Sequence, residues 1–256
     1  MAGSCHFLIN NFLTNDIFTV TNLIMWKRKE IDYNNKVVSL DIEATGYGRL
    51  TDVIQFSMIN ENRKSLFNIY TRPKKFTEKF LKKQLKRTSK LNRITFDKIK
   101  DRPPLYNYRE SIQKYLNRAD IIIGFAIKND LLWLNQNKIF IEEGKKIIDV
   151  QLLFKIYMYV QKDHPDWYKL LTLEKCCAYC DYGEKTKARR FHNSLGDAEA
   201  TMFCYEYLQC HYLNLDVGLT DSKGNQLFTK KDVDQNLSTL KRQSALLKDF
   251  ACVMTE

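Results

Sequence analysis

The chain has 256 residues, of which 44% are hydrophobic, and it carries a formal net charge of +11 and seven cysteines. This length and apolar content suffice for one large α/β domain, alone or with appendages. The sequence has no run of about 18 uncharged apolar residues, so we expect no transmembrane helix and no membrane partner. The N-terminal stretch lacks the basic region of a secretory signal, and an odd number of scattered cysteines is typical of a reducing, cytoplasmic location.

The positive charge is concentrated in one segment. Residues 72–102 hold thirteen of the 41 lysines and arginines but only three of the 30 acidic residues, so the rest of the chain is close to neutral. Positive charge of this local density suits a polyanion, which it attracts by steering and holds through counterion release. We therefore expect a nucleic acid as partner, although a solvated basic helix face would give the same pattern.

The first predicted elements after a helix near 12–26 are three strands. The stretches "KVVSLDIEATG", "DVIQFSMIN" and "SLFNIYTR" alternate well enough to form an antiparallel meander. Thr77 can then cap a basic helix that turns Leu81 and Leu85 inward. The stretch "YNYRESIQKYLNRA" is typical of a second helix.

The next elements have the pattern of a parallel sheet. The apolar run at 121–123 and the stretch "KKII" each precede a helix, as buried parallel strands do. Helices are also expected over "TLEKCCAYC" and "NSLGDAEATMFCYEYLQCHYL", and a last one near 237–250. We therefore divide the chain into an N-terminal extension at 1–35, a domain at 36–213, and a C-terminal linker and helix at 214–256.

Two acidic residues, Asp41 and Glu43, close the first predicted strand. Because side chains alternate along a strand, both point to the face opposite Val38, Leu40 and Ile42. Like charges beside a core repel each other and lose hydration, which raises at least one pKa unless a cation lies between them. The alternative is a strand end that has simply reached solvent.

Three more residues complete a candidate catalytic set. Asp130 follows the apolar run at 121–123, and His192 precedes Asp197 by five residues at the start of the long helix. The four carboxylates offer the hard oxygen ligands that a pair of Mg²⁺ or Mn²⁺ ions needs for phosphodiester hydrolysis. A histidine is a suitable base for the attacking water. Each residue alone has an ordinary explanation as a helix N-terminal acid or a loop histidine, so it is the combination that indicates catalysis.

The stretches "DIEATG", "IIGFAIKNDLLWL" and "HNSLGDA" resemble the three exonuclease motifs of the DEDDh (DnaQ-like) 3′–5′ exonuclease family. The resemblance covers roughly Lys36 to Tyr212. It implies a ribonuclease H-like mixed sheet, in which three antiparallel strands are continued by two parallel strands, flanked by helices. It also implies two divalent cations, Mg²⁺ or Mn²⁺, and a nucleic acid with a free 3′ end.

The resemblance further implies a role for each member of the catalytic set. Asp41 would bridge both cations, with Glu43 and Asp197 on the side of the nucleophile. Asp130 would serve the second cation, and His192 would be the general base.

Contacts to the substrate are implied in the same way. Backbone at Ala44 and Thr45 would lie against the terminal nucleotide, whose base would stack near Tyr47 or Leu50. The basic segment would hold the incoming strand through exposed side chains, which we expect to be Lys82, Lys83, Lys86 and Arg87.

The second motif departs from the family pattern. Family members commonly have G-H-N-x-x-F-D there, whereas this chain has Phe125 and Ala126 in place of the His-Asn pair and Asn129 before the acid. Because that pair usually helps to shape the pocket for the terminal nucleotide, its loss bears on substrate preference more than on catalysis. In the third motif, Ser194 replaces a common alanine.

We therefore expect a 3′–5′ exonuclease that releases nucleoside monophosphates. DNA is slightly favoured over RNA because nothing in the sequence reads a 2′-hydroxyl. One alternative is a catalytically weak nucleic-acid-binding module. Another is a proofreading subunit, acting in DNA repair or replication, that docks on a polymerase or another protein through residues 214–256.

A cysteine-rich stretch has residues that are also found in zinc sites. Cys176, Cys177 and Cys180 are followed by Cys204, a pattern that zinc sites also use. With Leu173, however, the first three have the spacing of one apolar helix face, and buried free cysteines behave as small hydrophobes. We therefore interpret them as core residues.

Overall fold

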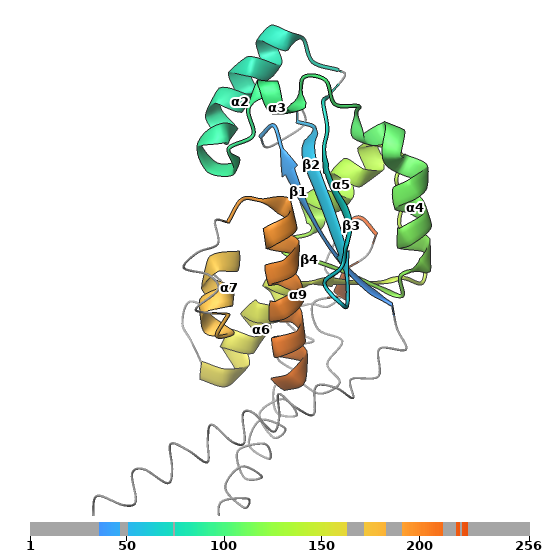
Figure 1. Ribbon diagram of the computed structural model, residues 1–256. Helices are drawn as coiled ribbons and strands as arrows, with labels where there is room; N and C mark the ends of the chain where they lie inside the picture. The colour runs from blue at the N-terminus through green and yellow to red at the C-terminus, as the bar shows by residue number, and fades with distance from the viewer. Residues whose placement is uncertain are drawn as a thin grey trace, which may run out of the picture. The chain divides into compact units, whose positions relative to one another are not determined.

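The computed structural model describes residues 36–46, 51–73, 75–162, 172–182, 191–211, 219–220 and 222–224. Their centre is a mixed sheet with the strand order β3-β2-β1-β4-β5-β6 (Figure 1). β2 pairs antiparallel with both β1 and β3, whereas β1, β4 and β5 run parallel. The strands are β1 (Val37–Ala44), β2 (Val53–Asn60), β3 (Ser65–Tyr70), β4 (Ile121–Gly124), β5 (Lys146–Asp149) and β6 (Leu219–Thr220). The predicted sheet of three antiparallel and two parallel strands is confirmed.

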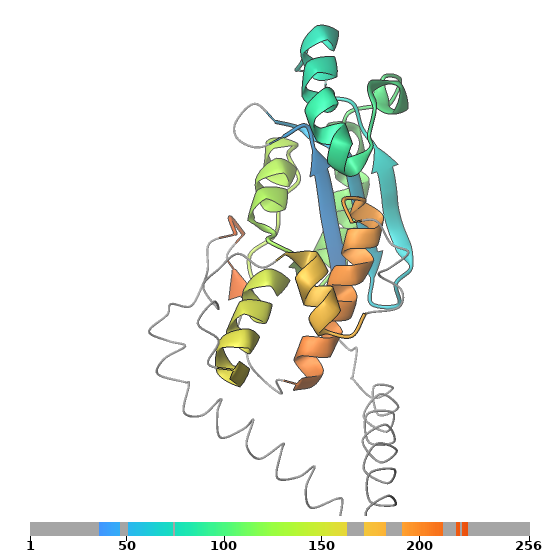
Figure 2. The ribbon, with the colours of Figure 1, turned by 90° about the vertical axis from the view of Figure 1, so that its left-hand side faces the viewer.

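Helices cover both faces of this sheet (Figures 1 and 2). α9 packs on β1 and β2 with α6 and α7 beside it, and α4 and α5 share a core with the opposite face of β1. The helices are α2 (Glu78–Asn92), α3 (Phe96–Ile99), the 3₁₀-helix η2 (Leu105–Tyr108), α4 (Arg109–Arg118), α5 (Lys128–Gln136), α6 (Val150–Lys162), α7 (Leu173–Tyr179) and α9 (Ser194–His211). Among the described residues, no helix has the length and apolarity needed to span a membrane.

The alternation of β1 orients the two acids that end it. Val38, Leu40 and Ile42 are buried in the core beneath α4 and α5. On the other face, the Ser39 hydroxyl donates a 2.8 Å hydrogen bond to the carbonyl oxygen of Ala198 in α9. Since Asp41 and Glu43 have the parity of Ser39, they face α9, as the strand period predicts.

α2 forms a second, smaller core with β2. The Thr77 hydroxyl accepts a hydrogen bond from the backbone N–H of Phe80 and so caps the helix, as predicted. Leu81 and Leu85 are buried together with Ile54 of β2 and with residues of the segment after the helix, Ile94 and Ile99. This packing places α2 beyond the end of β1, as Figure 2 shows.

The segment after residue 213 adds to the sheet, which the sequence predictions did not include. β6 pairs antiparallel with β5, with Ile148 opposite Leu219. In the turn that follows, Gly224 has φ +74° and lies so close to α5 that a Cβ atom would come within 2.6 Å of the Lys128 Cα. Glycine fits both the conformation and the close approach. The helices predicted near 12–26 and 237–250 lie outside the described residues.

Candidate active site

All five residues of the predicted catalytic set line one cavity of about 320 Å³. Asp41 and Glu43 come from the end of β1, Asp130 from the first turn of α5, and Asp197 from the first turn of α9. His192 lies in the loop before α9. The fold therefore brings together three sequence motifs at the end of one strand.

A β-bulge lies where β1 reaches the cavity. Glu43 pairs with Gln55 of β2, but Ala44 pairs with Val53, so the register shifts between them. Such bulges bend a strand and re-aim its side chains, and they are common beside active sites.

The spacing between His192 and Asp197 has a direct structural basis. The Asn193 side chain accepts a hydrogen bond from the backbone N–H of Leu195 at 3.2 Å, which starts α9. The Asp197 carboxylate then accepts a 2.9 Å hydrogen bond from the backbone N–H of His192. His192 has φ 67°, a left-handed conformation that histidine adopts more readily than most residues. One carboxylate therefore holds the histidine loop in place.

Glu43, His192 and Asp197 form a group that could hold a metal ion. One ligand atom from each residue lies within 4.8 Å of the others. Asp197 is 8% exposed, whereas the His192 side chain is open to solvent. The group thus joins two carboxylates in the cavity to an accessible imidazole.

The carboxylates of this cavity resist ionisation. Burial raises the pKa of Asp41 well above its usual range, and the charges of Asp197, Asp130 and Glu43 raise it further. Burial and then Asp197 raise the pKa of Glu43 to about 7, against a lowering effect of the hydrogen bond from Asn92. Each acid therefore opposes the ionisation of its neighbours.

Asp130 completes this repulsive set. Burial raises its pKa, and the charges of Asp149 and Glu43 add to the effect. Among the described residues, the ion pairs made by lysine and arginine do not involve Asp41, Glu43 or Asp130. Crowded carboxylates without a basic partner are the hard ligand set that magnesium and manganese prefer, so these residues fit a divalent cation.

The sequence motifs did not predict two residues that lie beside the carboxylates, Asn92 and Asp149. Asn92, the last residue of α2, donates a hydrogen bond from Nδ2 to the Glu43 carboxylate at 3.3 Å. It lines the cavity together with Thr88 and Leu91 of the same helix. No sequence motif signals an asparagine at a helix end as a partner of a distant glutamate.

Asp149, at the end of β5, is the other missed residue. Its Oδ1 accepts hydrogen bonds from the backbone N–H groups of Ala126 at 3.0 Å, Gln151 at 2.9 Å and Leu152 at 3.4 Å. It therefore caps α6 and fixes the loop after β4. Burial raises its pKa, and these three donors oppose that effect. A signal existed, because an acid between a buried strand and a helix is the same pattern that singled out Asp130.

The departures in the motifs have structural consequences. Phe125 and Ala126 both line the cavity, and Ala126 has φ 54°, a left-handed conformation that is strained for alanine. Ser194, in place of a common alanine, is fully buried, and its hydroxyl lies 2.7 Å from that of Ser57 in β2. This contact helps to anchor the start of α9 to the sheet.

The residues predicted to touch the terminal nucleotide are only partly described. Ala44 lines the cavity. Thr45 is 1% exposed, and its hydroxyl accepts a hydrogen bond from the backbone N–H of Asp52 at 3.1 Å. Tyr47 and Leu50 lie outside the described residues.

The predicted basic contacts are on α2 but do not line the cavity. Lys83, Lys86 and Arg87 are exposed. Lys82 pairs with Glu78 at 2.6 Å, and its ammonium lies 4.7 Å from the centre of the Phe96 ring. Helical geometry puts Arg87 and Lys83 on the row that leads to Leu91 at the cavity, with Lys82 and Lys86 turned further from it.

Comparison with known proteins identifies the fold. The sequence matches no protein-family profile and no curated protein. Its structure is similar to a crystal structure of a full-length 3′-exonuclease, with a TM-score of 0.53 and 13% identity over 77% of this chain and 91% of that one. This chain has the ribonuclease H-like fold of 3′-exonucleases.

Two further structures are similar. One is a 3′-exonuclease in 3′-end specific recognition of a histone mRNA stem-loop, with a TM-score of 0.50 and 14% identity over 81% of this chain and 76% of that one. The other is the Neurospora crassa Pan2 catalytic unit, with a TM-score of 0.50 and 14% identity over 69% of this chain. The match covers only 27% of that Pan2 chain.

Proposed function

We propose that the chain is a metal-dependent 3′–5′ exonuclease that hydrolyses terminal phosphodiester bonds of nucleic acid and releases nucleoside monophosphates. The observation that carries this proposal is the convergence of Asp41, Glu43, Asp130, His192 and Asp197 on one cavity. The similarity in fold to 3′-exonucleases supports it. The activity belongs to the domain at 36–213, with β6 contributed by the segment that follows.

The carboxylates would hold two divalent cations, Mg²⁺ or Mn²⁺. When bound, such cations activate a water nucleophile and stabilise the leaving oxygen in phosphodiester hydrolysis. The charges of Asp197, Asp130 and Glu43 all act on the Asp41 carboxyl group, which suits a ligand shared by two cations. The mutual repulsion of these acids favours cation binding because cations remove it.

His192 is the general base. Its side chain is exposed, and its ring lies in the group formed with Glu43 and Asp197. An exposed imidazole can accept a proton from the attacking water and pass it to solvent. The hydrogen bond from its backbone N–H to Asp197 keeps it beside the carboxylates.

Phe125 and α2 receive the substrate. Phe125 offers the cavity an aromatic face on which a terminal base can stack, in place of the histidine of the family pattern. The basic row of α2, with Lys83 and Arg87, approaches the cavity at Leu91 and would follow the phosphates of the incoming strand.

DNA is the favoured substrate, because none of the residues assigned above reads a 2′-hydroxyl. RNA is the second candidate, because one of the similar structures is of a 3′-exonuclease that recognises an RNA stem-loop. Matched DNA and RNA oligonucleotides of one sequence decide between them.

The test is digestion of oligonucleotides labelled at the 5′ end, with the 3′ end free or blocked. In Mg²⁺ or Mn²⁺ we expect stepwise shortening from a free 3′ end and none in a chelator. Asp41→Ala and His192→Ala should abolish cleavage and leave binding largely intact. Asp97→Asn is the matched control. The side chain of this acid on α3 is 84% exposed, so the substitution should leave cleavage unchanged.

The alternative of a binding module makes the opposite prediction. Wild-type protein that binds these oligonucleotides but cuts none of them with either cation would overturn the exonuclease proposal.

A further inference from the structure

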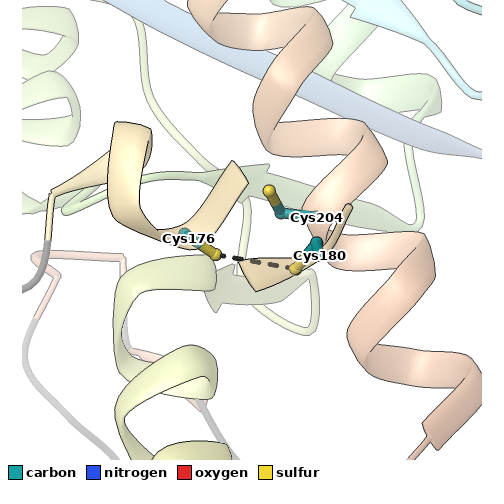
Figure 3. Close-up of side chains that lie close together, drawn as sticks. All are labelled: Cys176, Cys180 and Cys204. Carbon is teal, nitrogen blue, oxygen red and sulfur yellow. Dashed lines mark hydrogen bonds between the residues drawn. The ribbon is translucent and has the colours of Figure 1, made fainter. Parts of the chain in front are cut away.

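Four buried cysteines meet between α7 and α9. Cys176 and Cys177 lie on α7, Cys180 caps its C-terminal end, and Cys204 lies on α9. Each is at most 1% exposed, and all four are free thiols. Figure 3 shows the sulfurs of Cys176 and Cys180 directed toward each other, with Cys204 on the neighbouring helix beside them. More than half of the seven cysteines of the chain therefore gather at one place.

Three of the four sulfurs have a spacing that suits a tetrahedral metal site. The Sγ atoms of Cys176, Cys180 and Cys204 lie within 4.8 Å of one another. The separations are 4.0 Å between Cys176 and Cys180 and 3.7 Å between Cys177 and Cys204. With Zn–S bonds of about 2.3 Å, the sulfurs of a tetrahedral site are about 3.8 Å apart.

Apolar packing alone does not require this arrangement. The helical spacing of Cys176, Cys177 and Cys180 accounts for their burial beside Leu173. It does not account for Cys204, which comes from another helix and brings its sulfur within 4.8 Å of those of Cys176 and Cys180. A disulfide is not formed either, because the sulfurs are well beyond the bonded distance of about 2.05 Å.

We propose that this cluster binds one Zn²⁺ ion, with Cys176, Cys180 and Cys204 as its protein ligands. Three of the four positions of a tetrahedral site are then filled by thiolates, the ligands that structural zinc sites favour, and the fourth is left to another ligand. Binding displaces the thiol protons to solvent. The soft sulfur ligands distinguish this site from the hard oxygen ligands of the active-site cavity.

The ion would join the two helices that flank the active site. Cys204 lies seven residues, about two turns, after Asp197 on α9. Leu173, the first residue of α7, lines the cavity, and Cys176 follows one turn later. A zinc ion that links the helices therefore holds Asp197 and Leu173 at a fixed separation, and its role is positional.

Metal analysis of the full chain tests this proposal. The protein is produced with zinc in the medium, purified under reducing conditions and briefly treated with a chelator, which removes ions from the open cavity. We expect one zinc per chain in the wild type. Cys204→Ser and Cys204→Val should both lose it, although valine preserves the apolar packing. Asp197→Asn and Ala200→Ser, on the same helix, should keep it.

Cobalt substitution gives a second readout that does not depend on the variants folding well. Co²⁺ added to metal-free wild-type protein should produce sulfur-to-cobalt charge-transfer absorption and the intense visible bands of a tetrahedral site. Zinc should displace it. In Cys176→Ser the charge-transfer intensity should fall, because one thiolate is missing.

Three outcomes would overturn the assignment. The first is wild-type protein that takes up neither zinc nor cobalt while its four thiols are reduced. The second is zinc that survives Cys204→Val but is lost in Asp197→Asn, which would move it to the catalytic carboxylates. The third is a Cys177–Cys204 disulfide in protein purified without reductant. None of these outcomes counts against the exonuclease proposal, which is tested by the cleavage assays of Asp41→Ala and His192→Ala.

Discussion

Asn92 donates a hydrogen bond to the carboxylate of Glu43 over 3.3 Å, and so connects the basic helix α2 to the candidate metal-binding acids. The bond lowers the pKa of Glu43 against the effects of burial and of Asp197. It therefore favours the ionised form that a cation needs. The residue that ends the basic helix thus also contacts the proposed metal site.

We expect Asn92→Ala to lower activity about 10- to 100-fold, the usual effect of removing a partner that orients a metal ligand. The loss should diminish at high Mn²⁺ concentration, because the variant weakens cation binding more than chemistry. Steady-state rates as a function of Mn²⁺ measure this. Ser89→Ala, on the same turn but not lining the cavity, is the control and should have wild-type kinetics. Equal Mn²⁺ dependence in both variants would contradict the role given to Asn92.

The stability of the metal-free protein should fall with rising pH. The pKa of Glu43 is raised from 4.5 to about 7, so folding favours the protonated acid. The contribution of protonated Glu43 to the free energy of unfolding is fully present below pH 4.5 and is lost as the pH rises through about 7. The loss lowers the free energy of unfolding by an amount on the order of 3 kcal/mol. Denaturant unfolding in a chelator, at pH values on either side of this window, measures the change. Mn²⁺ should restore stability at the higher pH, and a flat profile would contradict the raised pKa of Glu43.

Asp41→Asn should stabilise the metal-free protein while abolishing cleavage. Burial and three neighbouring carboxylates disfavour the ionised form of Asp41. The asparagine side chain does not ionise, so the variant avoids this cost. We expect the free energy of unfolding to rise by more than about 1 kcal/mol in a chelator near pH 8. The gain should disappear near pH 4, where the wild-type acid is protonated. Asp97→Asn, at an exposed position, should change neither quantity. A loss of stability in Asp41→Asn at high pH would contradict the raised pKa of Asp41.

Ala126→Gly should also stabilise the protein. Ala126 has φ 54°, where an L side chain costs roughly 1–2 kcal/mol and glycine does not. Part of this gain is offset by the greater freedom of glycine in the unfolded chain, so we expect about 0.5–1 kcal/mol. Thermal unfolding measures it. Ala200→Gly, inside α9, is the matched control and should destabilise by about 1 kcal/mol. The same sign for both substitutions would exclude strain at Ala126.

Lys83 and Arg87 should contribute more to substrate binding than Lys82 and Lys86. The first pair lies on the helical row that leads to Leu91 at the cavity. Lys83→Ala with Arg87→Ala should raise KM with kcat nearly unchanged. The double variant should also bind single strands with a weaker salt dependence. The slope of the logarithm of the binding constant against the logarithm of the salt concentration should become shallower by about 0.7 for each phosphate that is no longer neutralised. Lys82→Ala with Lys86→Ala carries the same change of charge and should have a smaller effect. Equal effects would indicate a general electrostatic attraction without a defined path.

Several structural features were predictable because they depend on local periodicity. The period of two along β1 directs Asp41 and Glu43 away from Val38, Leu40 and Ile42, and the structure agrees. The capping of α2 by Thr77 follows from the chemistry of a single residue beside a helix start.

Other contacts could not be predicted, because they join segments that are far apart in the chain. Asn92 is 49 positions from Glu43, and Cys204 is 27 positions from Cys177. The helical pattern of the cysteines predicted their burial correctly but carried no information on which other sulfur they would meet. The close approach of Gly224 to α5 could not be predicted either, because Gly224 belongs to a stretch whose sequence is typical of a linker.

The sequence by itself determined the five strands β1 to β5, the face that each acid of β1 takes and the three motifs that resemble an exonuclease. These follow from short-range backbone geometry and from residue spacing, which the order of amino acids specifies directly. Only the tertiary structure decided that the five catalytic candidates share one cavity, that α2 contacts Glu43 and that three thiols lie at the spacing of a metal site. Those relationships depend on how α2, α7 and α9 pack against the sheet, and packing brings together side chains whose distance along the chain has no bearing on their distance in space.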